Sequence, residues 1–165
     1  MKTSTDTIQS GVLQKVVDEQ ADLSMDRITR AIMSSSETDL NPIKKAPLNT
    51  PTLEYQTCLG YQDGQPVWGD KERIKYVEEQ GSIIWSQNWD MPEARTVVWT
   101  NWVPTSLEGE SPNGLDDNGN GLVDEQGLSF DSVGPKVNIR MTLKRTDPHG
   151  RVYKATLNNT VTCRN

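Results

Sequence analysis

Four carboxylates and two carboxamides gather between Asp116 and Glu125, separated by glycines and without a lysine or arginine among them. Within this stretch the string DDNGNG, residues 116–121, fits the pattern D-x-[DN]-x-[DN]-G, in which alternate side chains offer oxygens to one cation. Calcium takes about six to eight oxygen ligands from carboxylates, amides, backbone carbonyls and water. The residue types and their spacing therefore predict a calcium loop.

The expected ligands follow from counting along the pattern. Asp116, Asn118 and Asn120 take the first, third and fifth positions, and the sixth is a glycine that permits a sharp turn. The seventh position would offer a backbone carbonyl, and acids follow it. The predicted metal-binding set is therefore Asp116, Asn118, Asn120, Leu122, Asp124 and Glu125.

The loop departs from an EF-hand at its twelfth position, which is Gly127 instead of a bidentate glutamate. No helical pattern flanks it, so it is closer to the shorter calcium loops of extracellular proteins, with Asp124 or Glu125 left to complete the shell. The alternative is a polar turn that binds no ion. Crowded carboxylates repel one another without a cation, which favours the calcium loop. Magnesium, which retains several waters, and zinc, which prefers sulfur or imidazole, fit less well.

The acidity of the chain is local. Of 23 acids and 17 bases, residues 104–131 contain seven acids and no base, so the remainder is close to neutral. A nucleic-acid-binding protein needs a basic face, and we expect no nucleic-acid partner.

Catalysis has little support in the sequence. The single histidine, His149, lies in the turn TDPHG, and no GxSxG, HExxH or phosphate-loop motif occurs. We therefore predict that the protein is not an enzyme. Cys58 and Cys163 have no CxxC context, and a disulfide between them and two free thiols both remain open.

Trp85, Trp89, Trp99 and Trp102 fall within eighteen positions. Aromatic side chains at this density either pack in a core or form a platform on which sugars stack. Core packing is the favoured interpretation.

The rest of the chain predicts an α+β fold, a long N-terminal helix packed on an antiparallel sheet. Residues 6–36 show apolar positions at roughly the 3.6-residue period, and residues 37–51 contain three prolines and no period. From residue 52 onward, β-branched and alternating segments predict strands. We expect one domain, with residues 1–51 forming the helix and a surface linker and residues 52–165 the sheet region. No apolar run approaches the roughly 20 residues of a transmembrane helix, so the chain as printed is expected to be soluble.

Three segments in this order resemble the type IV pilin-like proteins, and in particular the minor pseudopilins such as the J subunit of type II secretion. The helix ends in MDRITRAIMSSSE, the middle runs WVPTSLEGESPNGLDDNGNGLVDEQGLSF and VNIRMTLKRTDPHGR, and the chain closes with TVTCRN. The final Arg164-Asn165 pair is similar to the end of the family's closing strand.

The resemblance implies a non-enzymatic structural subunit of a type II secretion or type IV pilus-like filament in a bacterium. Its helix would pack on other pilin or pseudopilin subunits through apolar residues such as Val12, Val16 and Leu23. Calcium in the sheet region would support folding and assembly. Family members carry a transmembrane segment that a prepilin peptidase processes, so residues upstream of about Thr3 would anchor the protein in the inner membrane, facing the periplasm.

A second interpretation belongs to another class. It is an extracellular calcium-dependent module that binds glycans or proteins, with the tryptophans as its contact surface.

Overall fold

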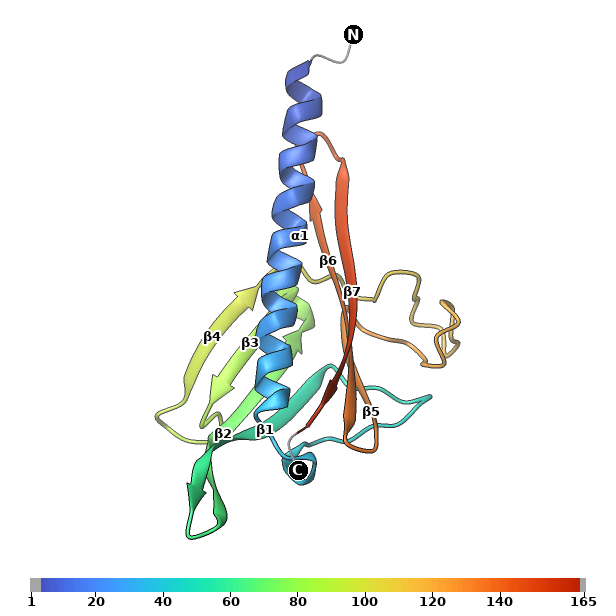
Figure 1. The fold of residues 1–165 in the computed structure, drawn as a ribbon. Helices are drawn as coiled ribbons and strands as arrows, with labels where there is room; N and C mark the ends of the chain where they lie inside the picture. Colours follow the sequence, from blue (N-terminus) through green and yellow to red (C-terminus); the bar gives the residue numbers. More distant parts are fainter. Residues whose placement is uncertain (1–3, 164–165) are drawn as a thin grey trace.

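The computed structural model describes residues 4–163, with side chains described from residue 10 onward. One long helix, α1 (Ser4–Met33), lies against two antiparallel sheets (Figure 1). The first sheet has the order β1 (Thr52–Gln62), β2 (Gln65–Val77), β3 (Ser82–Gln87), β4 (Arg95–Thr100). The second has the order β5 (Leu128–Val133), β6 (Lys136–Thr146), β7 (Val152–Thr162). The predicted α+β class is confirmed, with two sheets where one was expected, and the Arg164-Asn165 pair lies outside the described residues.

The buried side of α1 is a single stripe of apolar residues spaced by three or four positions. Its members are Val17, Ala21, Met25, Ile28 and Ile32. Residues at this spacing share one face of a helix, and they join side chains of both sheets in one hydrophobic core. No helix among residues 4–163 is long and apolar enough to cross a membrane.

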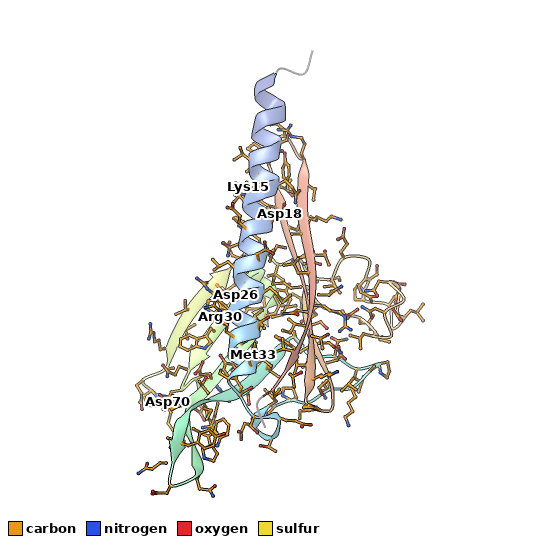
Figure 2. All side chains as sticks on the ribbon, viewed as in Figure 1. Lys15, Asp18, Asp26, Arg30, Met33 and Asp70 are labelled. Carbon is orange, nitrogen blue, oxygen red and sulfur yellow. The ribbon has the colours of Figure 1, made fainter. Side chains whose placement is uncertain are left out.

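The apolar residues predicted to contact neighbouring subunits lie off this stripe. Val12 is 56% exposed and Leu23 is 44% exposed, while Val16 is half-buried. Charged residues share the exposed surface of the helix, where Lys15, Asp18, Asp26 and Arg30 are seen along its length (Figure 2). The outer surface of α1 is therefore mixed, with single apolar side chains set among charges.

The helix ends three residues before its predicted end. The hydroxyls of Ser34 and Ser35 donate to the carbonyls of Ala31 and Ile32, each at 2.7 Å. Serine side chains that bind backbone carbonyls compete with the helical ladder, which accounts for the end at Met33. A short 3-10 turn (Glu37–Asp39) follows.

The connecting segment, residues 40–51, does more than cross the surface. It pairs with the first sheet through an Asn41–Glu54 bridge and with the second through a Thr50–Phe130 bridge. Leu40 is buried in the core. The segment predicted as a surface linker therefore joins the two sheets.

Both cysteines are free thiols in the structure. Cys58 is half-buried, and its amide donates to the Ser34 carbonyl at 2.9 Å. Cys163 is buried, and burial raises the pKa of its thiol. The disulfide that the sequence left open is absent between these two residues.

The turn between β6 and β7 is organised by the carboxylate of Asp147. One oxygen accepts the N–H groups of His149 and Arg151, both at 2.9 Å, and the other accepts Arg151 Nε at 2.6 Å and the Tyr153 hydroxyl at 3.2 Å. Burial alone raises the pKa of this carboxyl, but the donors outweigh burial and lower the pKa to about 2. His149 itself is exposed, in the turn where the sequence places it.

We expect the free energy of unfolding to fall as the pH drops from 4 to 2, in part through Asp147. Its folded pKa of about 2 lies below its ordinary 3.8, so its stabilisation is present above the ordinary value and is lost toward the folded value. Asp147→Asn is therefore less stable than the wild type at pH 7 and loses less stability over this interval. Urea unfolding at several pH values measures both effects. Asp63→Asn, at an exposed hairpin turn, is the control, and parallel curves for Asp147→Asn and wild type would contradict the assignment.

Candidate metal centre

The acidic loop, residues 101–127, joins β4 to β5 and lies on the side of β6 and β7 away from the first sheet (Figure 1). Its two ends pair with each other, because Leu107 N–H donates to the Glu125 carbonyl at 3.0 Å and Gly127 N–H to the Thr105 carbonyl at 3.3 Å. Thr142 of β6 then donates to the Gly127 carbonyl at 2.8 Å. The loop therefore leaves the sheet from a fixed base.

The far part of the loop is fastened to the connecting segment. Val123 N–H donates to the Pro47 carbonyl at 3.0 Å, and Asn49 Nδ2 donates to the Val123 carbonyl at 2.8 Å. The Leu122 side chain is fully buried next to these bonds. Leu122 is thus an apolar anchor of the loop, and the metal-binding role predicted for its carbonyl stays a prediction.

The Asp116 carboxylate shapes the turn that follows it. Its oxygens accept the N–H groups of Gly119 at 2.7 Å, Asn120 at 3.1 Å and Gly121 at 2.7 Å. Gly121 has a φ of +89°, a conformation that a glycine adopts without strain. The sharp turn predicted at the sixth position is confirmed.

Two buried carboxylates meet at Asn118. Glu125 is 1% exposed, and its Oε2 accepts Nδ2 of Asn118 at 3.1 Å and of Asn120 at 2.7 Å. Glu110 is 8% exposed, and its Oε1 accepts the Asn118 N–H at 3.0 Å. Glu125 Oε1 and Glu110 Oε2 are buried without a hydrogen-bond partner. Buried carboxylate oxygens in this state are unfavourable unless a cation or a proton meets them.

Positive charge is scarce around these carboxylates. Arg140 Nε lies 3.7 Å from Glu125 Oε1, but the same guanidinium also forms an ion pair and hydrogen bond with the buried Asp131. Burial raises the pKa of Glu125, the hydrogen bonds from Asn120 and Asn118 and the charge of Arg140 oppose the rise, and the charge of Glu110 adds to it. Within residues 4–163, Arg140 is therefore the one positive charge shared by the buried carboxylates of Glu125 and Asp131, and Glu110 adds a third negative charge close by. A divalent cation would balance this excess of negative charge.

Not every predicted ligand converges on this point. Asp124 is exposed and in the left-handed region at a φ of +52°, and its Oδ1 accepts the N–H groups of Asn113 at 2.8 Å and Gly114 at 2.9 Å. Its carboxylate is thus engaged in holding the start of the loop. Asn118, Asn120 and Glu125 are brought together, with Glu110 in addition.

Glu110 was not predicted, because it precedes the ligand pattern and approaches it only through the fold. Among residues 4–163, no three Asp, Glu, His or Cys side chains form a metal-binding group. A cation here would therefore also draw on amide and backbone oxygens, and calcium stays a prediction.

The structure explains why the twelfth position is a glycine. A Cβ atom at Gly127 would lie 2.2 Å from the Pro104 carbonyl oxygen and 2.7 Å from Val103 Cγ1. No side chain fits there, so a glutamate in the EF-hand manner is sterically impossible.

The four clustered tryptophans do not form one platform. Trp85 and Trp99 line a groove between α1 and the first sheet, whereas Trp89 lies beneath the Arg73 guanidinium at 4.2 Å and Trp102 beneath that of Arg145 at 4.8 Å, outside that groove. Three of them, Trp85, Trp99 and Trp102, pack against the core while remaining partly exposed.

Comparisons of the chain with protein-family models, curated proteins and solved structures found no match.

Gly127→Ala tests the steric role of this glycine. Forcing a methyl group against the Pro104 carbonyl should lower the free energy of unfolding by about 1–3 kcal/mol, the usual cost of overpacking. Gly11→Ala on α1, where an added Cβ meets nothing within 4 Å, is the matched control and should stabilise by about 0.5–1 kcal/mol. Urea unfolding compares the two, and equal effects of the two substitutions would rule out the close approach.

Proposed function

We propose that this chain is a non-enzymatic structural subunit of a type II secretion or type IV pilus-like filament, a minor pseudopilin, with calcium in its acidic loop. The single observation that carries the calcium part is the pair of buried carboxylates, Glu110 and Glu125, each with one oxygen that accepts no hydrogen bond. The filament part is supported by the long N-terminal helix followed by antiparallel sheets, and by the resemblance of the sequence segments.

In this proposal the ion is structural. Asp116, Asn118, Asn120, the Leu122 carbonyl and Glu125 supply oxygens, and Glu110 completes the shell in place of Asp124. The loop is fastened at its base to β6 and at Val123 to the connecting segment. Ordering the loop would therefore stabilise the junction between the two sheets.

Assembly would use the outer face of α1. Val12, Val16 and Leu23 are exposed or half-buried in the single chain and would be covered by helices of neighbouring subunits. A transmembrane segment upstream of this chain would hold the subunit in the inner membrane, with the described domain on the periplasmic side or in a cell-surface filament.

An extracellular calcium-dependent glycan-binding module is the second candidate. The shared groove of Trp85 and Trp99 favours it, because aromatic faces stack on sugars. A glycan array probed with and without a calcium chelator separates the two functions, and binding to no glycan in either condition removes the module.

Calcium should raise the melting temperature of the wild type. A ligand at a hundredfold excess over its Kd stabilises the native state by about 2.7 kcal/mol, which corresponds to roughly 5–10 °C for a domain of this size. Glu125→Gln removes a buried charge, so it should melt at the same or a higher temperature than the wild type in chelator and show no calcium-dependent rise. Differential scanning calorimetry in chelator and in calcium measures both.

Further variants sharpen this test. Asp116→Ala should lose most of the calcium-dependent rise, whereas Asp117→Asn should keep it, because Asp117 is exposed and only accepts Asn113 Nδ2 at 2.8 Å. Magnesium at the same concentration is expected to give a smaller shift. A wild type that melts identically in chelator and in calcium would contradict a calcium site.

The gene sequence upstream of residue 1 tests the filament part. We expect a prepilin peptidase site followed by about 20 apolar residues, the length that crosses a bilayer. A charged or unrelated upstream sequence would contradict the filament subunit while leaving the calcium result untouched.

A further inference from the structure

Of the four strands at the ends of the two sheets, three are covered in part by other segments of the chain. The edge of β1 bonds to the end of the helix and to the connecting segment, through Cys58 N–H to the Ser34 carbonyl at 2.9 Å and through the Asn41–Glu54 bridge. The edge of β5 bonds to the connecting segment, with Ser132 N–H donating to the Lys44 carbonyl at 2.7 Å. The edge of β7 runs beside α1 (Figure 1), where Gln14 Nε2 donates to the Lys154 carbonyl at 2.9 Å.

The edge of β4 is open along residues 95–98. Within residues 4–163, its outer side receives one hydrogen bond, from Gln20 Nε2 of α1 to the Trp99 carbonyl at 2.9 Å, close to the end of the strand. Val97 and Val98 are 37% and 54% exposed. Proteins usually protect such edges with lysine, proline or a strong bulge. The pairing of β4 with β3 has one irregularity, and it lies beside Trp99 at the end of the strand, so it does not interrupt residues 95–98. On the side away from β3, residues 95–98 therefore present backbone groups that no other part of residues 4–163 pairs with.

A groove of about 530 Å³ lies between α1 and the face of the first sheet, and it reaches β4 at Val97 and Trp99. Tyr55, Trp85, Val97 and Trp99 form its aromatic and apolar lining, and Arg27 and Arg30 of α1 line it from the other side. An incoming strand on β4 would therefore point alternate side chains into this groove.

The aromatic lining is held in place by Glu72. Its Oε2 accepts the Tyr55 hydroxyl at 2.8 Å and Trp85 Nε1 at 2.7 Å, and its Oε1 accepts the Thr57 hydroxyl at 3.1 Å. Burial and the neighbouring Glu72 raise the pKa of Tyr55, which keeps its hydroxyl protonated as a donor. The one carboxylate of the groove is thus already occupied by internal hydrogen bonds.

Two positive charges in and beside the groove are, in contrast, available. The Arg27 guanidinium lies 6.0 Å from the Trp99 ring centre and that of Arg95 lies 5.8 Å from the Trp85 ring centre. Both arginines are exposed, and neither has an acidic partner within the described part of the chain, whereas Arg30 is paired with Asp26 at 2.8 Å. This positive site stands out on a chain with a net charge of −6.

We propose that the β4 edge and this groove bind an extended acidic peptide segment of another protein. Its backbone pairs with β4, its acidic side chains meet Arg27 and Arg95 over the tryptophan rings, and its alternate side chains lie beside Val98 on the other face of the sheet. This mode, in which backbone bonds supply affinity and alternate side chains supply specificity, is the addition of a strand to a sheet edge. A glycan would leave the β4 backbone groups unpaired, and the charge of the chain disfavours nucleic acid.

The experiment uses the full chain and fluorescein-labelled hexapeptides, with fluorescence anisotropy as the readout. A hexapeptide alternating glutamate and valine should bind saturably, and one alternating lysine and valine should bind at least tenfold more weakly. The acidic hexapeptide with alternate backbone amides N-methylated, on the side that would face β4, should lose binding, because it keeps its charge but cannot donate to the edge.

Matched variants locate the site. Arg27→Ala with Arg95→Ala should weaken binding of the acidic hexapeptide about tenfold, as expected for two exposed charge pairs. Lys15→Ala with Arg145→Ala removes the same net charge away from the groove and should leave binding unchanged. Binding should also shift the indole N–H resonance of Trp85 in two-dimensional NMR while leaving that of Trp102 in place, a readout that needs no variant.

Three results would overturn the proposal. They are an absence of binding by the acidic hexapeptide, equal binding of its N-methylated form, and equal loss of binding in the two double variants. Equal binding of the N-methylated peptide would show that charge attraction, without strand pairing, accounts for binding. Equal loss in the two double variants would show that binding depends only on the net charge of the protein.

Discussion

Within residues 4–163 the two sheets share no backbone ladder, and one stripe of apolar side chains on α1 packs against both of them. Ile28 and Ile32 share a single core with Ile74 of the first sheet and with Ile139 and Met141 of the second. Burial of such residues contributes about 1.5–3 kcal/mol each, so this contact sets how the sheets are placed relative to each other. The acidic loop leaves from β4 and returns through β5, so its two ends belong to different sheets, and its base depends on that packing. The groove beside β4 depends on it as well, because one of its walls is the helix.

The helix and most strands of this fold can be predicted from the sequence, but the elements against which each of them packs cannot. The helix has the right period, and the alternation in β6 marks one buried face. The strand β5 alternates apolar and polar residues from Leu128 to Asp131, yet all of its residues but the last are buried, so its sequence pattern does not show that both of its faces are covered. The choice of helix face was also beyond the sequence. Apolar residues occur around much of α1, and only contact with both sheets selects Val17 over Val16.

In the candidate metal centre, too, the local turn can be predicted from the sequence, whereas contacts from distant residues cannot. Asp116, Asn118 and Asn120 lie in a pattern whose geometry is local, and the turn at Gly121 follows from it. Glu110 lies outside that pattern and reaches Asn118 only because the ends of the loop pair with each other. Asp124, one of the two acids predicted to complete the shell, bonds instead to the backbone at the start of the loop. The glycine at position 127 is explained by the close approach of the Pro104 carbonyl, a contact that cannot be inferred from the spacing of residues in the sequence.

The coverage of three sheet edges limits how copies of this chain can associate through their strands. A β-sheet protein with two open edges can add chains in both directions, and growth of that kind leads to fibres. Within residues 4–163, other segments cover parts of the edges of β1, β5 and β7, whereas β4 is open along residues 95–98. Two copies that paired through β4 would each cover that stretch. Any further strand pairing would have to use another exposed stretch, such as the part of β2 before Glu72, which β3 does not reach.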